Sequence, residues 1–120
     1  MENNSSFITL KSRSNYLSIR KFGHRIHTKN GLIFNFQLNN LSYSRIGWTL
    51  PKYVGNAVQR NRLKRYCRES SRKLSQKINS LCLDVNIVFA KKGKDNFKNL
   101  RCLEVEESIT EFISKYSKKF

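Results

Sequence analysis

The chain has 120 residues and a formal net charge of +16, from 24 Lys and Arg residues against 8 Asp and Glu residues. This length suffices for one modest hydrophobic core, and a hydrophobic content of 38% favours a folded domain over a disordered chain. So positive a charge indicates a polyanionic partner, either nucleic acid or an anionic membrane surface. No apolar run approaches the roughly 18 residues that span a bilayer. Nucleic acid is therefore the favoured partner, and no membrane association is expected.

The first residues and the cysteines indicate the compartment. The opening segment, MENNSSF, has neither a basic start nor an apolar stretch, so we expect a cytoplasmic protein. Cys67, Cys82 and Cys102 are widely spaced and form no C-x-x-C pair, and both histidines lie far from them. Reduced thiols are therefore favoured over a zinc site, and we expect no metal or other cofactor bound by the protein.

In chain order, the pattern predicts a disordered tail over residues 1–9, a single domain over residues 10–116 and a frayed end over residues 117–120. Within the domain we expect helices over residues 12–22, 55–77 and 96–116, and strands over residues 25–28, 32–38, 43–50 and 84–90.

Two of these strands have a clear period of two. Leu32, Phe34 and Phe36 alternate with more polar residues, and Ile46 and Trp48 do the same in the next strand. We therefore predict that residues 32–38 and 43–50 form an antiparallel hairpin with one face toward the core. In the last helix, four glutamates cluster in the middle, so we expect that helix to act as scaffold away from a bound polyanion.

The predicted helix over residues 55–77 is the strongest functional signal. It carries eight Lys or Arg residues, and Glu69 is its only acid. At about 100° per residue, an apolar or small-residue stripe separates from a cationic face. The stripe consists of Leu63, Cys67, Ser70, Leu74 and Ile78. Because solvated helices usually interleave acids with bases, this pattern indicates binding to a phosphate backbone.

The run from Gly55 to Arg65, GNAVQRNRLKR, continuing to Arg68 and Glu69, resembles the signature of the bacterial ribonuclease P protein subunit. The resemblance implies an α/β fold (α+β, two layers) with the order α-β-β-β-α-β-α. It implies a sheet of roughly four strands and a β-α-β crossover that can be left-handed, as in one ribosomal protein domain. Its partners would be the catalytic RNA of ribonuclease P, with one protein per RNA, and precursor tRNA.

The resemblance also assigns candidate site residues. For the catalytic RNA these are Lys52, Asn56, Arg60, Asn61, Arg62, Lys64, Arg65, Arg68 and Arg72. For a cleft that holds the 5′ leader of precursor tRNA they are Tyr16, Arg20, Asn35, Arg45 and Thr49. Tyr16 matches an aromatic position of the family, whereas Arg20 stands where a second aromatic would be expected. From the pattern alone, Tyr16 is equally well interpreted as an aromatic at the edge of the core.

The chain offers no convincing acid–base pair, set of metal-binding carboxylates or Gly-rich phosphate loop. This agrees with what the resemblance implies, namely that catalysis is carried by the RNA with Mg²⁺ held by the RNA and its substrate. The alternative is a ribosomal or other structural RNA-binding protein with no associated cleavage. A DNA-binding helix-turn-helix protein ranks last, because strands and Pro51 precede the basic helix.

Overall fold

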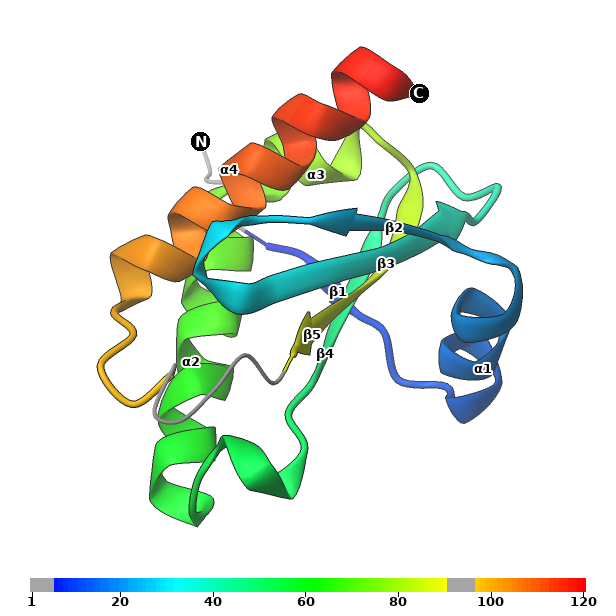
Figure 1. Ribbon diagram of the computed structural model, residues 1–120. Coiled ribbons are helices and arrows are strands. Elements are labelled where there is room, and N and C mark those ends of the chain that lie inside the picture. Colours follow the sequence, from blue (N-terminus) through cyan, green and yellow to red (C-terminus); the bar gives the residue numbers. More distant parts are fainter. Residues whose placement is uncertain (1–5, 91–96) are drawn as a thin grey trace.

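The computed structural model describes residues 6–90 and 97–120, in which a five-stranded mixed sheet is covered by helices on both faces (Figure 1). The α-helices are α1 (Arg13–Phe22), α2 (Ala57–Lys73), α3 (Ser75–Asn79) and α4 (Cys102–Lys119). The strands are β1 (Ile8–Thr9), β2 (His24–His27), β3 (Leu32–Leu38), β4 (Arg45–Thr49) and β5 (Leu83–Phe89). Two short 3₁₀ turns, η1 (Lys29–Gly31) and η2 (Lys52–Val54), precede β3 and α2.

The strand order is β1-β4-β5-β3-β2, with β5 in the middle of the sheet. β5 pairs antiparallel with β3 and parallel with β4, so the predicted hairpin between residues 32–38 and 43–50 is wrong. The hairpin in the structure joins β2 to β3. The period-two pattern identified the buried face of each strand, but alternation carries no information about which strand lies alongside.

The start of the folded domain differs from the prediction. Ile8 and Thr9 pair with β4, and the backbone N–H of Leu10 donates to the carbonyl of Ile46 at 3.0 Å. The expected disordered tail over residues 1–9 is therefore wrong for these two residues, while residues 1–5 lie outside the described part of the chain. This strand also makes the sheet five-stranded. Two residues are too few to produce a recognisable alternation.

The end of the domain is also more ordered than predicted. α4 continues to Lys119, and the ring of Phe120 stacks on Tyr116 with centroids 5.4 Å apart. Phe120 also meets the ring of Phe36 edge-on at 5.4 Å. The predicted frayed end over residues 117–120 is wrong, because aromatic contacts with the core fix this segment.

The hydrophobic core lies between the sheet and the layer formed by α2, α3 and α4, while α1 lies on the opposite, outer face (Figure 1). Phe34 of β3 stacks on Phe112 of α4 at 4.7 Å, and both are almost fully buried. Burying a side chain of this kind stabilises the fold by about 1.5–3 kcal/mol. Leu63 and Cys67 of α2 belong to the same core, which confirms the predicted buried stripe.

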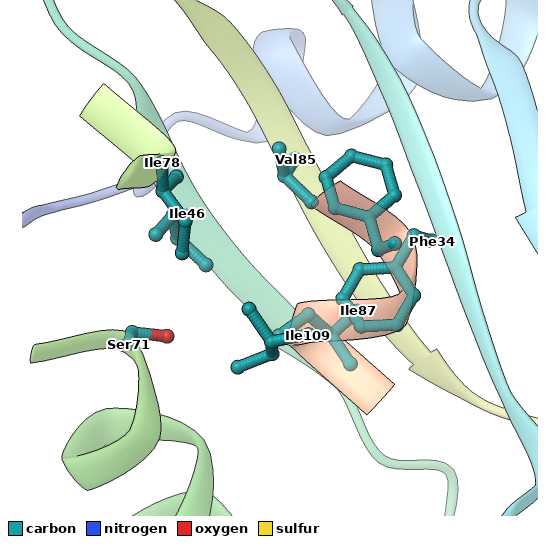
Figure 2. A pocket seen from close by; sticks show the side chains of 8 residues that line it. Phe34, Ile46, Ser71, Ile78, Val85, Ile87 and Ile109 are labelled. Carbon is teal, nitrogen blue, oxygen red and sulfur yellow. The ribbon is translucent and has the colours of Figure 1, made fainter. Parts of the chain in front are cut away.

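A small apolar space remains between the sheet and this helical layer (Figure 2). Phe34, Ile46 and Ile109 are among the side chains that line it. The hydroxyl of Ser71, on α2, also borders the space and has no hydrogen-bond partner among the described residues. This space belongs to the interior of the domain and offers no opening for a nucleic acid.

The predicted single helix over residues 55–77 is divided in two. Leu74 leaves the helical conformation at φ −102° and ψ 16°, which separates α2 from α3. After the break, Ser75 and Ile78 are both buried, and Ile78 is part of the core. No Gly or Pro marks the break, so the prediction of one continuous helix had no local signal against it.

Candidate nucleic-acid interface

α2 begins with a capping box that fixes the direction of its first turn. The backbone N–H of Gln59 donates to Oδ1 of Asn56 at 2.9 Å, and the backbone N–H of Asn56 donates to Oε1 of Gln59 at 3.0 Å. A Cβ at position 55 would collide with the Gln59 side chain, so Gly55 is required by this cap. The side-chain oxygen of Asn56 has this capping role, and the expectation that Asn56 binds RNA stays a prediction.

Beyond the cap, α2 presents a cationic surface with little opposing charge. We define the α2 basic face as Arg60, Asn61, Arg62, Lys64, Arg65, Arg68 and Arg72. Arg60, Arg62 and Lys64 are half-buried, and the other four are exposed. The one acid on α2, Glu69, approaches Arg65 only to 3.9 Å, and both side chains are more than half exposed. An ion pair so exposed contributes little, so the face remains available to an external anion.

Two arginines of this face also contact the rest of the protein. Nη2 of Arg62 donates to the backbone carbonyl of Lys98 at 3.0 Å, which connects α2 to the segment before α4. The guanidinium of Arg68 lies 5.8 Å from the centre of the Trp48 ring, a cation–π arrangement with β4. These contacts restrict the two side chains before any ligand binds. Lys52 is exposed in η2, which comes just before the N-terminal end of α2.

The acidic helix α4 packs directly beside α2. Lys73 of α2 pairs with Glu106 at 3.3 Å, and Glu111 pairs within α4 with Lys115 at 2.9 Å. Part of the acidic cluster is therefore matched by protein cations. The expectation that this helix faces away from a bound polyanion stays a prediction.

On the outer face, Tyr16 of α1 lies against β4. Its hydroxyl donates to the carbonyl of Leu10 at 2.9 Å, and a Cβ at position 47 would collide with the same hydroxyl. Only glycine at position 47 therefore lets α1 approach the sheet this closely. Burial raises the pKa of Tyr16, and a hydrogen bond with the backbone of Trp48 partly offsets this. Tyr16 is thus anchored to the sheet, whichever of its two predicted roles holds.

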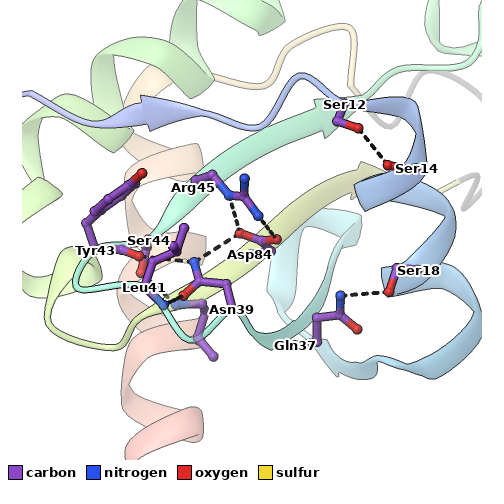
Figure 3. A network of polar contacts seen from close by, with 11 residues as sticks. Ser12, Ser14, Ser18, Gln37, Asn39, Leu41, Tyr43, Ser44, Arg45 and Asp84 are labelled. Carbon is purple, nitrogen blue, oxygen red and sulfur yellow. Dashed lines mark hydrogen bonds and ion pairs between the residues drawn. The ribbon is translucent and has the colours of Figure 1, made fainter.

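Arg45 was predicted to line the leader cleft, but the structure commits it to an ion pair (Figure 3). Its Nε and Nη2 donate to the two carboxylate oxygens of Asp84 at 2.7 and 2.6 Å. Asp84 is 2% exposed and also accepts from Nδ2 of Asn39 at 3.0 Å. The hydrogen bonds to Asp84 raise the pKa of Arg45. Because two of its three nitrogens are bound to Asp84, the guanidinium has little freedom to leave for a ligand. We therefore assign Arg45 a structural role.

The remaining cleft candidates lie on or near one cross-strand row. Asn35 of β3 stands opposite Asn86 of β5, and Asn86 stands opposite Gly47 of β4. The hydroxyl of Thr49 donates to Oδ1 of Asn86 at 3.0 Å. Oδ1 of Asn35 is buried without a partner among the described residues. Tyr16 covers one end of the row at Gly47, whereas Arg20 is exposed on α1.

Asn86 is the polar residue of this row that the sequence analysis did not single out. It lies in the middle of a strand that was predicted to be buried, and with 8% exposure it is buried. An Asn within an otherwise apolar strand was the available signal, because a buried amide needs partners. That Asn35 and Thr49 are neighbours of Asn86 follows only from the strand register.

Two further properties concern chemistry and location. The described residues bring together no group of three or more His, Cys, Asp or Glu side chains able to hold a metal ion. Cys67 is fully buried, and burial raises the pKa of its thiol. None of the helices in residues 6–90 and 97–120 combines the length and apolar character needed to cross a bilayer.

Comparison with known proteins agrees with these features. The chain is 38% identical over 101 residues to the ribonuclease P protein component of Fusobacterium nucleatum subsp. nucleatum, covering 84% of this chain and 89% of that protein. It is 34% identical to the same component of Alkaliphilus metalliredigens, covering 88% and 90%. The solved ribonuclease P protein of Thermotoga maritima superposes with a TM-score of 0.78 at 27% identity, covering 89% of this chain and 96% of that one. A model of the ribonuclease P family matches residues 5–117, and the chain therefore belongs to the ribonuclease P protein family.

Proposed function

We propose that this chain binds the catalytic RNA of ribonuclease P through the α2 basic face and contacts the 5′ leader of precursor tRNA across the outer face of the sheet. The observation that carries the proposal is the α2 basic face itself, which has one weakly held acid and a capped, fixed first turn. The assembly would remove the leader and release mature tRNA 5′ ends in the cytoplasm, with one protein bound per RNA.

The chemistry of the α2 basic face suits a folded RNA backbone. Five of its seven residues are arginines, and arginine offers planar, paired donors to phosphate oxygens. Nε of both Arg60 and Arg62 is buried without a partner among the described residues. Unsatisfied donors are costly in the free protein, so a phosphate that draws these side chains outward would recover that cost.

The outer face suits a single strand. Tyr16 presents an aromatic ring beside a row of amide and hydroxyl groups from Asn35, Asn86 and Thr49. Stacking on an aromatic ring with hydrogen bonds to base edges is the usual way in which proteins bind unpaired RNA. The leader is the unpaired part of precursor tRNA, so the outer face fits the leader.

In this proposal the protein supplies binding and position, and the RNA supplies catalysis. Mg²⁺ would be held by the catalytic RNA and the substrate, and it would activate water and stabilise the leaving oxygen of the phosphodiester. The side chains of this chain would hold the catalytic RNA and the precursor tRNA in position relative to each other. The protein would therefore increase substrate affinity rather than carry out a chemical step.

The salt dependence of binding tests the role of the α2 basic face. About five phosphate contacts should give a slope of log K against log[salt] near −4, at about −0.7 to −0.9 per contact. Arg65→Ala should make the slope shallower by about 1 and weaken binding to the catalytic RNA equally with or without a leader substrate. Lys77→Ala, an exposed residue of α3 outside the face, is the matched control and should change neither. A slope near zero for the unaltered protein would mean that these cations are only solvated.

A further inference from the structure

A second basic surface lies at the opposite edge of the sheet from β1. We define the β2-edge pocket as the open hollow lined by Arg25, Ile26, His27, Lys115, Lys118 and Lys119. The first three residues come from β2, and the three lysines come from the last turns of α4. Two elements distant in sequence therefore bring basic side chains to one hollow, and among the residues that the structure describes no carboxylate lines it.

Within this pocket, one lysine has a structural role. Nζ of Lys115 contacts a carboxylate oxygen of Glu111 at 2.9 Å and donates to the carbonyl of His27 at 2.9 Å, which fastens α4 to the edge strand. Arg25, Lys118 and Lys119 are exposed, and none of them forms an ion pair with the described residues. Lysines at a helix C-terminus are favoured by the helix dipole, which explains two of these cations but not Arg25 of β2.

The strand register connects this pocket to the outer face. Arg25 stands opposite Asn35, which stands opposite Asn86, which in turn stands opposite Gly47 beneath Tyr16. Paired residues in adjacent strands point to the same side of a sheet, so these positions form one row. Three inter-strand steps give the row a length of about 14 Å. A strand of RNA laid along the row from Tyr16 reaches the β2 edge at Arg25.

We propose that the β2-edge pocket holds backbone phosphates of the distal part of the leader, beyond the nucleotides that lie on the outer face. This inference rests on the proposed function, because it extends the path of the same single strand. Single-stranded RNA is the favoured occupant since the pocket continues a row of groups suited to unpaired bases. The exposed ammonium groups supply attraction to phosphate without sequence preference.

The test uses the holoenzyme reconstituted with a bacterial ribonuclease P RNA and precursor tRNAs that differ only in leader length. The leaders would be one, about five and about ten nucleotides long. Single-strand-binding folds cover about 4–16 nucleotides, so these lengths run from below that range to its middle. The variant Lys118→Ala/Lys119→Ala removes two exposed cations and leaves the Lys115 contacts in place. Lys73→Ala/Lys77→Ala lowers the net charge equally at a distance from the pocket and serves as the matched control.

We expect the pocket variant to match the unaltered protein with the two shorter leaders. With the longest leader its affinity should fall about tenfold at physiological salt, because two single-strand phosphate contacts contribute about 1.4 to the salt slope. The control variant should keep the dependence on leader length that the unaltered protein shows. Equal weakening with every leader would overturn the inference and place the pocket against the catalytic RNA or the tRNA body. No weakening with any leader would also overturn it. If the unaltered protein itself gains nothing from a longer leader, the leader contact of the proposed function fails as well.

Discussion

Replacing Arg45 with Met should lower the free energy of unfolding by about 3 kcal/mol, since breaking a buried ion pair from one side costs about 3–5 kcal/mol and partial exposure reduces this. The substitution would leave the Asp84 carboxylate, which is 2% exposed, without its guanidinium, while Arg45 itself is 26% exposed at its side chain. Asn39 would remain as a single neutral donor to Asp84. Urea unfolding of the isolated protein gives the measurement.

A double-mutant cycle separates this structural role from a role in binding. Asp84→Asn combined with Arg45→Met removes the uncompensated charge, so the double variant should recover part of the stability that Arg45→Met loses. Under conditions where they are folded, Arg45→Met and the double variant should both retain the preference for precursor over mature tRNA. An Arg45→Met protein of normal stability with weakened precursor binding would restore Arg45 to the leader cleft and contradict the structural assignment.

Replacing Tyr16 with Ala should weaken binding of precursor tRNA relative to mature tRNA by about 1–3 kcal/mol, the usual cost of one lost stacking contact. The effect should disappear when the leader is trimmed to one nucleotide. Affinities of the holoenzyme for the three tRNAs give the measurement. Because the Tyr16 hydroxyl also donates to Leu10, Tyr16→Phe is the matched control. It should cost about 1 kcal/mol of stability for the lost hydrogen bond while keeping the precursor preference.

A second variant displaces the Tyr16 ring without replacing Tyr16. Gly47→Ala places a methyl group where the Tyr16 hydroxyl lies, so the ring must move away from β4. This variant should lose the precursor preference much as Tyr16→Ala does. If Tyr16→Ala instead unfolds the protein, or weakens mature and precursor tRNA equally, Tyr16 is a core residue and the leader contact is wrongly placed.

The sequence predicted those parts of the fold that depend on periodicity. The buried positions of β3 and of α2 follow from periods of two and 3.6, and Phe34, Leu63 and Cys67 are buried as expected. The pairing of strands could not be predicted in the same way. β5 lies between β3 and β4, and six of its seven residues are buried, as is typical of a central strand. Alternation within a strand does not identify its neighbours.

The candidate site likewise has one part that periodicity predicts and another part that depends on strand pairing. The α2 basic face could be predicted because it lies on one helix, where spacing alone fixes which residues share a side. The outer-face residues come from three strands and α1, so their grouping depends on register. Arg45 illustrates the difference, because its partner Asp84 lies 39 positions away in the chain and nothing in the local sequence connects them. The capping role of Asn56 was within reach, since Asn followed three residues later by Gln resembles a capping box.

The central claim is that this chain assists cleavage by a catalytic RNA, and cleavage by the reconstituted assembly tests this claim most directly. Precursor tRNA would be incubated at low Mg²⁺ with the protein alone, with a bacterial ribonuclease P RNA alone, and with both, and the 5′ ends of the products would be mapped. We expect no cleavage by the protein alone and a marked stimulation of correct 5′ maturation when both are present. Strong cleavage by protein rigorously freed of RNA, or no stimulation of the RNA by the protein, would contradict the account.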